Sequence, residues 1–146
     1  ALGLAEGALE FAGRYLDERR QFGQRLSSFQ GLRFKIADYA TEIEAARMLL
    51  QAAADAVDHG SDNVIQLSSM AKLFATEVAM RVTTDAVGLL GGYGYLTDYP
   101  VERLMREAKL TQIVEGTNEI QRVVIAKEWF RRLQGDHRSP LETAGN

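Results

Sequence analysis

Apolar residues recur along the chain at steps of three and four positions, the spacing that places side chains on one face of an α-helix. In the first segment the core-facing positions are Leu2, Ala5, Leu9, Ala12 and Leu16. A second helix over residues 29–59 would extend about 45 Å. Its core-facing positions are Leu32, Ile36, Tyr39, Ile43, Ala46, Leu50, Ala53 and Val57. Their mean period of about 3.5 is typical of helices packed at shallow angles in a bundle.

Three further helices are predicted. The third follows an N-cap at Ser61-Asp62 and ends at Gly91-Gly92. Its core-facing positions are Leu67, Ala71, Phe74, Val78, Val82, Ala86 and Leu89. A short fourth begins near Pro100 and has one face made of Val101, Leu104, Met105 and Ala108. The last begins near Thr117 and presents to the core Ile120, Val123, Ala126, Phe130 and Leu133. We therefore predict an all-α fold, an up-down four-helix bundle with an additional short helix over residues 1–134, followed by a flexible polar tail over 135–146.

Composition narrows the possible classes of function. With 146 residues and 46% hydrophobic content, the chain forms one domain with its own core. Its net charge of -3 argues against nucleic acid as the main partner. No apolar run approaches the roughly 18 to 20 residues of a membrane span. The absence of cysteine excludes disulfides and thiolate nucleophiles, and fits a reducing compartment.

The two histidines and the chain start carry little chemistry. His59 and His137 stand in expected loops beside Gly60 and Asp136, so we predict that they face solvent and that the chain has no metal site. The sequence begins in a helical pattern without an initiator Met or a signal peptide. This predicts that the chain is a piece of a longer protein.

Glu115 is the best candidate for a catalytic group, because it lies between apolar Ile113-Val114 and the break Gly116-Thr117. We expect a tight interhelical turn there, with Thr117 capping the next helix. A dry, apolar pocket would make the carboxylate a stronger base, whereas the positive end of the following helix would oppose this. If desolvation dominates, Glu115 is a general base. The alternative is a solvated turn residue.

Two other stretches suggest a cofactor site, each with a simpler explanation. The glycines of residues 88–94 would let backbone amides approach phosphate, but the stretch follows a helix and lacks Rossmann or P-loop spacing, so it is also a plain helix stop. Arg19, paired with Phe22, would bind a pyrophosphate and stack on a flat ring. An arginine there also gains simply from the helix dipole.

Taken in order, these motifs resemble the acyl-CoA dehydrogenase family. The resemblance rests on residues 89–96, on residues 98–109, on Ile113-Val114-Glu115-Gly116-Thr117-Asn118-Glu119-Ile120-Gln121-Arg122, and on Arg19-x-x-Phe22-Gly23. It extends from residue 1 to about residue 133 and corresponds to the family's C-terminal helical domain. The family's N-terminal helical and middle β domains have no counterpart in this sequence.

The resemblance implies a function for the Glu-Gly-Thr turn. Glu115 would remove the α-proton of a fatty acyl-CoA while N5 of FAD accepts a hydride from the β-carbon, giving the trans-2-enoyl-CoA of fatty acid β-oxidation. Its backbone N–H, with a flavin hydroxyl, would polarise the thioester carbonyl, a device worth about 3 to 4 kcal/mol per donor. Val114 would line the acyl pocket, and Gly116 would let the thioester approach the backbone.

The resemblance also implies that FAD is shared between subunits of a homodimer or homotetramer. The residues that would reach a neighbouring subunit's flavin are Arg19, Gln21, Phe22, Leu26, Phe29, Gln30, Gly88, Leu89, Gly91 and Gly92. Thr117 and Glu119 would contact the flavin bound with their own subunit's Glu115. Gly88 stands where the family usually has Gln, so a side-chain amide contact to the cofactor is missing there, and neighbouring backbone amides would have to serve.

Partners and alternatives follow from the same resemblance. The expected electron acceptor is an electron-transfer flavoprotein, and the expected location is the bacterial cytoplasm, or the mitochondrial matrix in a eukaryote. An oxidase of the same fold, whose reduced flavin reacts with oxygen, stays open, as does a non-catalytic helical interaction bundle. Acyl chain length and branching are not predicted.

Overall fold

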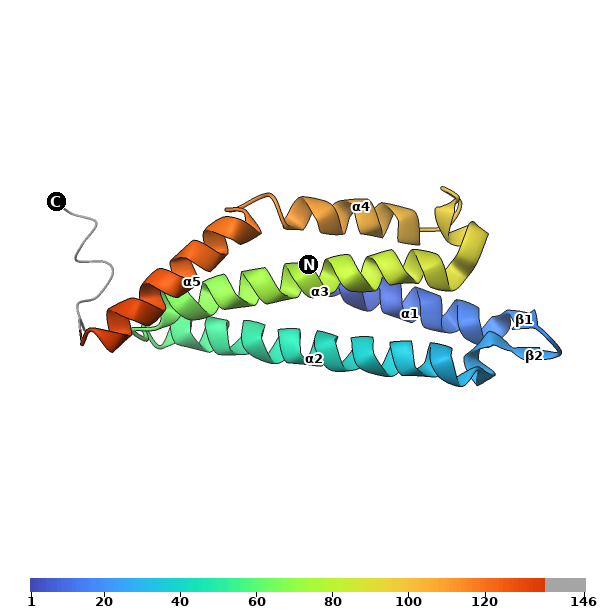
Figure 1. Cartoon of the computed structure of the whole chain (residues 1–146), viewed down its shortest axis with the longest axis horizontal. Helices are drawn as coiled ribbons and strands as arrows, with labels where there is room; N and C mark the ends of the chain where they lie inside the picture. Colours follow the sequence, from blue (N-terminus) through green and yellow to red (C-terminus); the bar gives the residue numbers. More distant parts are fainter. Residues whose placement is uncertain (136–146) are drawn as a thin grey trace.

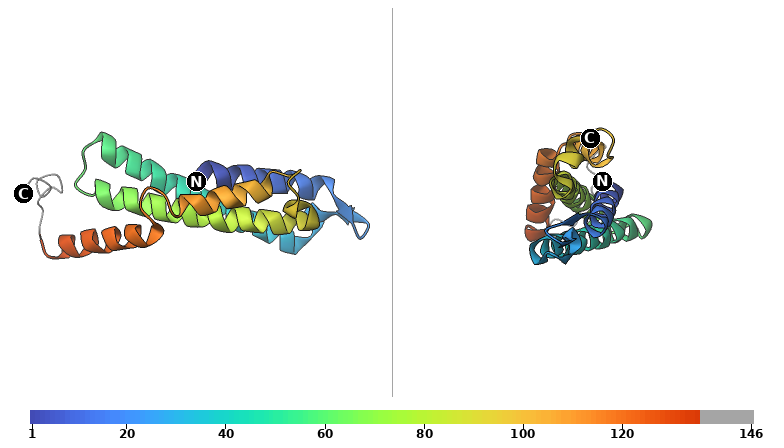
Figure 2. Two further views of the ribbon diagram at one scale, coloured as in Figure 1. Left: turned by 90° about the horizontal axis from the view of Figure 1, so that it is seen from above. Right: turned by 90° about the vertical axis from the view of Figure 1, so that its right-hand side faces the viewer.

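The fold is a bundle built on three long helices, as seen in the computed structural model, which describes residues 1–135 (Figures 1 and 2). Its helices are α1 (Leu2–Glu18), α2 (Gln30–Asp58), α3 (Val64–Leu90), α4 (Val101–Thr111) and α5 (Asn118–Leu133). The all-α prediction, with one additional short helix, is confirmed. The predicted tail over 135–146 lies outside the described residues, apart from its first residue.

Helix α3 is the central element, because it contacts all four of the other helices. In Figure 1 it runs between α4 above and α2 below, and α5 descends across it toward the α2–α3 loop. The core on this axis contains Val78 and Val82, each at most 1% exposed. On α1 the buried side chains are mainly alanines, and small side chains let two helix axes approach closely. The α4 end of the core is closed by Val101, which is 0% exposed.

The helix boundaries lie close to the predicted ones. Thr117 caps α5 as expected, since its hydroxyl oxygen accepts a hydrogen bond from the Ile120 backbone N–H at 3.4 Å. The N-cap of α3 is Asn63 and not Ser61-Asp62, and its side chain makes no capping hydrogen bond. Pro100 stands at the N-cap of α4, one position before the first helical turn.

The predicted core face of the last helix is wrong. Its large apolar side chains are more than half exposed: Ile120 53%, Val123 63%, Phe130 60% and Leu133 69%. Ala126 is exposed too. Helix α5 instead buries Asn118 and Glu128, and Glu128 accepts a hydrogen bond from Arg131. A periodic stripe shows which side chains share a face, but it does not say which face meets the neighbouring helix.

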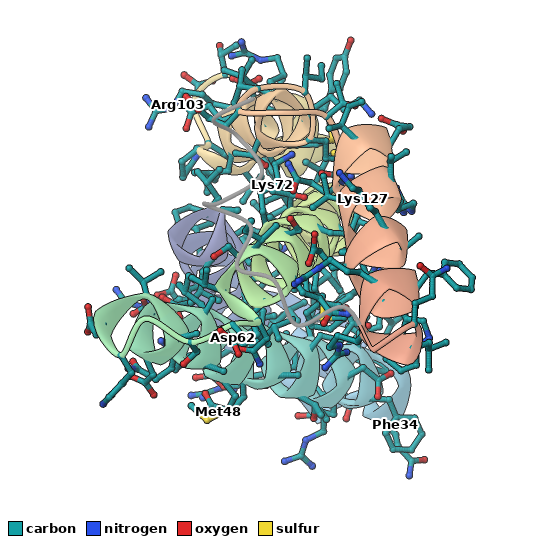
Figure 3. The ribbon with its side chains drawn as sticks, turned by 90° about the vertical axis from the view of Figure 1, so that its left-hand side faces the viewer. Phe34, Met48, Asp62, Lys72, Arg103 and Lys127 are labelled. Carbon is teal, nitrogen blue, oxygen red and sulfur yellow. The ribbon has the colours of Figure 1, made fainter. Side chains whose placement is uncertain are left out.

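Helix α2 departs from its predicted face at its C-terminal end. Leu50 is 47% exposed and Val57 is 59% exposed, whereas Ile43 and Ala53 are buried. Phe34 and Met48 also point away from the bundle at its periphery (Figure 3). The described chain therefore leaves apolar surface open along α2.

A small hairpin between α1 and α2 was not predicted. Strand β1 (Arg20–Gln21) pairs antiparallel with β2 (Gln24–Arg25). The connecting pair, Phe22 and Gly23, has φ values of 54° and 80°. Two left-handed residues in a two-residue loop are the geometry of a tight hairpin turn. Two short 3-10 helices, η1 (Leu26–Ser28) and η2 (Gly91–Tyr95), complete this end of the bundle.

Among residues 1–135, no helix is both long enough and apolar enough to cross a membrane.

An ion pair between α2 and α3 gives the fold a pH dependence. Lys35 on α2 donates a hydrogen bond to Asp85 on α3. Burial raises the pKa of Asp85, but hydrogen bonds from Lys35 and Tyr39 outweigh it and hold the pKa below the ordinary 3.8. A lowered pKa adds stability above pH 3.8, and this contribution is lost as the pH falls below that value.

We expect Asp85→Asn to lower the free energy of unfolding at neutral pH by up to about 1 kcal/mol, since the pair is partly exposed. The difference from wild type should begin to shrink below pH 3.8 and disappear as the pH falls through the lowered pKa of Asp85 in the folded state. Urea unfolding across this range measures it, with the exposed Asp38→Asn on α2 as the matched control. A difference that is the same at every pH would contradict the assignment.

Candidate active site

The turn between α4 and α5 holds the candidate base in an unusual backbone conformation. Glu115 has φ 55° and Gly116 has φ 83°. A left-handed conformation is uncommon for a glutamate and costs about 1 to 3 kcal/mol unless its surroundings compensate. The Gln121 amide compensates in part, since it donates to the carbonyls of Glu115 at 3.3 Å and Gly116 at 3.1 Å. The tight turn predicted from the sequence is confirmed.

The same turn requires glycine at position 116. A Cβ added to Gly116 would lie 2.9 Å from the Gln121 amide nitrogen. The left-handed φ also disfavours any side chain there. Both the backbone conformation and the Gln121 contact therefore favour glycine at this position.

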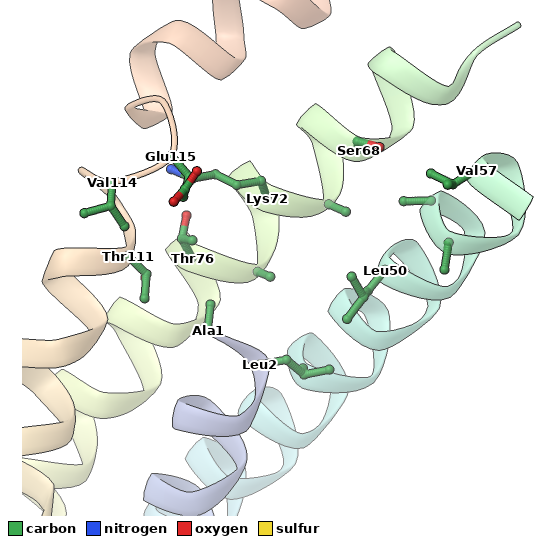
Figure 4. Close-up of a pocket in the computed structure, with 14 residues that line it drawn as sticks. Ala1, Leu2, Leu50, Val57, Ser68, Lys72, Thr76, Thr111, Val114 and Glu115 are labelled. Atoms are coloured by element: carbon green, nitrogen blue, oxygen red, sulfur yellow. The ribbon is translucent and has the colours of Figure 1, made fainter.

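Glu115 lies at the wall of an apolar pocket of about 510 Å³, which α1, α2 and α3 form together with the α4–α5 turn. Figure 4 shows Val57 and Leu50 on the α2 side and Val114, Glu115, Lys72 and Thr76 at the other end. The lining residues are Ala1, Leu2, Leu50, Ala53, Ala54, Val57, Ser68, Ala71, Lys72, Ala75, Thr76, Thr111, Val114 and Glu115. The pocket offers an apolar tail a surface that ends at a carboxylate.

Within the described chain Glu115 is exposed, and Val114 is 43% exposed. The dry environment that makes a carboxylate an effective base is thus not supplied by these residues alone. A ligand or another part of the protein would have to exclude water from the open side of the pocket.

A second, polar pocket of about 230 Å³ lies at the N-terminus of α5. It is lined by Glu77, Lys109, Gln112, Ile113, Thr117, Asn118, Glu119 and Arg122. Glu119 accepts hydrogen bonds from its own backbone N–H and from the Thr117 hydroxyl, and these lower its pKa below the ordinary 4.5. Arg122 and Lys109 contribute smaller effects in the same direction. Thr117 and Glu119, two of the predicted cofactor residues, therefore meet in one pocket.

The other predicted cofactor residues gather at the end of the bundle that holds the hairpin and η2, whereas the Thr117 pocket lies beside the middle of α3 (Figure 1). The Arg19 guanidinium stacks over the Tyr93 ring at 5.6 Å. Phe22 is 88% exposed and meets Phe29 edge-on with ring centroids 6.2 Å apart. Gln21 and Gln30 are exposed beside them. The structure thus brings the predicted residues together as two groups, one at each site.

The remaining residues of the hairpin-end group differ in exposure. Leu26 packs against the core, and Leu89 is only 9% exposed, so Leu89 has little beyond its backbone to offer a ligand. Gly88, Gly91 and Gly92 are exposed. A Cβ at Gly88 would meet nothing within 4 Å, so packing does not explain the glycine at this position.

Sequence reasoning missed three polar residues beside the turn. Lys72 and Thr76 of α3 both hydrogen-bond to Asn118, the first residue of α5. The partners lie 46 and 42 positions apart in the chain, so no local pattern joins them. One sequence signal could have pointed to this cluster: Lys72 stands among apolar residues on a helix that was otherwise assigned to the core.

Comparison with known proteins decides the family. The family model described as acyl-CoA dehydrogenase, C-terminal domain, matches residues 1–130. This chain belongs to the acyl-CoA dehydrogenase family. The expected fold of the family's helical domain is confirmed.

Individual relatives agree with this assignment. Cyclohexane-1-carbonyl-CoA dehydrogenase from Geobacter metallireducens is 56% identical over 128 residues, 88% of this chain and 33% of the relative. Butyryl-CoA dehydrogenase from Megasphaera elsdenii superposes with a TM-score of 0.86 at 49% identity, over 89% of this chain and 34% of the solved one. A chain in the structure of the electron transferring flavoprotein of Acidaminococcus fermentans gives a TM-score of 0.86 at 54% identity, with the same coverage. The chain spans about a third of the length of these acyl-CoA dehydrogenase relatives.

Proposed function

We propose that residues 1–134 are the C-terminal helical bundle domain of an FAD-dependent acyl-CoA dehydrogenase. The observation that carries the proposal is a carboxylate on a left-handed turn at the end of an apolar pocket, in a chain of this family. In this proposal the chain acts within a longer flavoenzyme, which converts an acyl-CoA thioester to the trans-2-enoyl-CoA. The names of the relatives refer to different acyl groups, so the proposal covers acyl-CoA thioesters as a class.

Each turn residue then has a chemical task. The Glu115 carboxylate takes the α-proton, and the Glu115 backbone N–H donates to the thioester carbonyl oxygen, which stabilises the charge that develops there. Gly116 leaves room for the thioester at the backbone, and Val114 contacts the acyl chain. When bound, the flavin supplies the hydride acceptor.

The residues of both groups fit a dinucleotide cofactor. Thr117 and Glu119 line a polar pocket at a helix N-terminus, where a ribose or phosphate finds donors and acceptors. The hairpin end offers the exposed Phe22 ring and the Arg19 guanidinium, a combination suited to a flat base and a pyrophosphate. Because one group lies at the hairpin end of the bundle and the other beside the middle of α3, we propose that they serve different flavins in a homodimer or homotetramer.

We further propose that electrons pass to an electron-transfer flavoprotein and that the enzyme works in the bacterial cytoplasm. The similarity to a chain in the Acidaminococcus fermentans structure and the bacterial origin of the relatives support this. An acyl-CoA oxidase of the same fold is the competing enzyme. Rapid peroxide formation when the reduced holoenzyme meets air would favour the oxidase.

The test of the proposal is anaerobic bleaching of the flavin absorbance of the intact holoenzyme by a panel of straight and branched acyl-CoAs. We expect at least one acyl-CoA to bleach the flavin and to yield the trans-2-enoyl product. The free acids, which lack the thioester, serve as controls. A flavin that no acyl-CoA in the panel reduces would favour the non-catalytic bundle.

A further inference from the structure

The Asn118 side chain is a buried polar group near the candidate base. It is 4% exposed, and its Oδ1 accepts hydrogen bonds from Lys72 Nζ at 2.8 Å and from Thr76 Oγ1 at 3.0 Å. Both donors stand on α3, whereas Asn118 is the first residue of α5. One amide oxygen therefore joins the start of α5 to the central helix.

The orientation of this amide follows from its partners. A lysine only donates hydrogen bonds, so the oxygen of Asn118 has to face Lys72. Its Nδ2 is then buried without a hydrogen-bond partner among residues 1–135. A buried unsatisfied donor costs about 1 to 3 kcal/mol. An apolar side chain would avoid that cost, which indicates that the two bonds to the oxygen serve a purpose beyond packing.

The backbone at Asn118 closes the turn that carries the base. Its N–H donates to the Gln112 carbonyl at 3.1 Å, across the Glu115-Gly116 turn. The side chain of Asn118 fixes the same residue to α3. The left-handed backbone of Glu115 is therefore held from its C-terminal side by a point that cannot move without breaking bonds to α3.

Asn118 also stands between the two pockets. Lys72, Thr76 and Glu115 line the apolar pocket. Asn118 lines the polar pocket with Thr117 and Glu119. The hydrogen bonds to its oxygen are thus the direct polar link from the wall of one pocket to the wall of the other.

We propose that Asn118, held by Lys72 and Thr76, is a positioning residue that sets Glu115 relative to both the acyl group and the flavin. This inference rests on the proposed function, because it assigns a role within that reaction. Lys72 is the main donor, since the single Thr76 proton is shared between Asn118 and the Leu73 carbonyl at 3.1 Å.

Burial lowers the pKa of Lys72 from the ordinary 10.5, and the nearby Glu119 opposes the shift. The protonated amine carries three N–H donors and no acceptor, and it donates one hydrogen bond to the Asn118 oxygen.

The experiment is single-turnover flavin reduction in the intact holoenzyme, with acyl-CoA varied to separate the limiting rate from the Kd. We expect Lys72→Met to lower the limiting rate about 10- to 100-fold with an unchanged Kd, because a displaced base costs rate and not binding. Lys127→Met, the same change at an exposed position of α5, should leave the rate unchanged. Figure 3 shows Lys127 on α5 and Lys72 among the helices.

Thr76 provides a second, conservative pair of variants. Thr76→Val removes the hydroxyl at nearly constant volume and should lower the limiting rate by a smaller factor than Lys72→Met. Thr76→Ser keeps the donor and should restore the rate toward wild type. This pair decides the question if Lys72→Met loses its flavin.

Several outcomes would overturn the inference. They are a wild-type limiting rate in Lys72→Met or in Thr76→Val, an equal fall in both Thr76 variants, or a shift of the pH profile at an unchanged maximal rate. Glu115→Gln is measured in parallel. If Glu115→Gln reduces its flavin normally, Glu115 is not the base and the proposed function fails. If Glu115→Gln is slow but Lys72→Met is not, the positioning role alone fails.

Discussion

We expect Glu115→Gln to keep the flavin bound and to stop its reduction by acyl-CoA. Glutamine matches glutamate in size but cannot accept the α-proton. A positioned general base contributes about 10²- to 10⁴-fold to the rate, so the reduction rate should fall at least that far. Anaerobic stopped-flow absorbance of the holoenzyme measures the rate, and the flavin spectrum before mixing reports that the cofactor is retained.

The control replaces another glutamate in the same way. Glu44 lies on the exposed side of α2, where it pairs with Arg47 at 3.0 Å, away from both pockets. Glu44→Gln should reduce its flavin at the wild-type rate. If Glu115→Gln were also reduced at the wild-type rate, the base would have to stand elsewhere in the enzyme, and the pocket of this chain would serve binding alone.

The backbone of Glu115 explains why this substitution is cleaner than most. The φ of 55° is set by the turn, and the Gln121 amide bonds to the two carbonyls of the turn and not to the Glu115 carboxylate. Changing the carboxylate to an amide therefore leaves these contacts in place. A loss of rate is then attributable to the missing base and not to a rearranged turn.

The sequence predicted the long helices and the turn because both depend on local patterns. The three-and-four spacing continues through α2 and α3 for many turns, and Thr117 follows a glycine in a position suited to capping. The Phe22-Gly23 hairpin was missed because a left-handed phenylalanine is rare and no propensity favours it. Its exposed ring nevertheless belongs to a motif that the family resemblance had singled out.

The packing of α5 and the Asn118 contacts were beyond local reasoning. The apolar stripe that includes Phe130 predicts a core face. In the structure, α5 instead meets α3 through a more polar side that includes Asn118. Which side meets α3 is decided by residues distant in the chain, such as Lys72, 46 positions from its partner. The candidate base was thus predictable from its turn, whereas the contacts that position it were not.

The largest effect on stability is expected for Gly94→Ala. Gly94 is buried in η2, and an added Cβ would lie 2.3 Å from the Val87 carbonyl oxygen and 2.9 Å from the Val87 carbonyl carbon. These atoms belong to the backbone of α3, so no side chain can rotate away to relieve the contact. Overpacking usually costs about 1 to 3 kcal/mol, and a clash with backbone should exceed that range.

Gly92→Ala is the matched control, because it makes the same change two positions earlier in η2, where a Cβ would meet nothing within 4 Å. It should change the free energy of unfolding by no more than about 0.5 kcal/mol. Urea unfolding followed by far-ultraviolet circular dichroism compares the two. Equal midpoints would mean that η2 does not rest on α3 as described. A selective loss of stability in Gly94→Ala would show that the fold depends on the close approach of η2 to the backbone of α3.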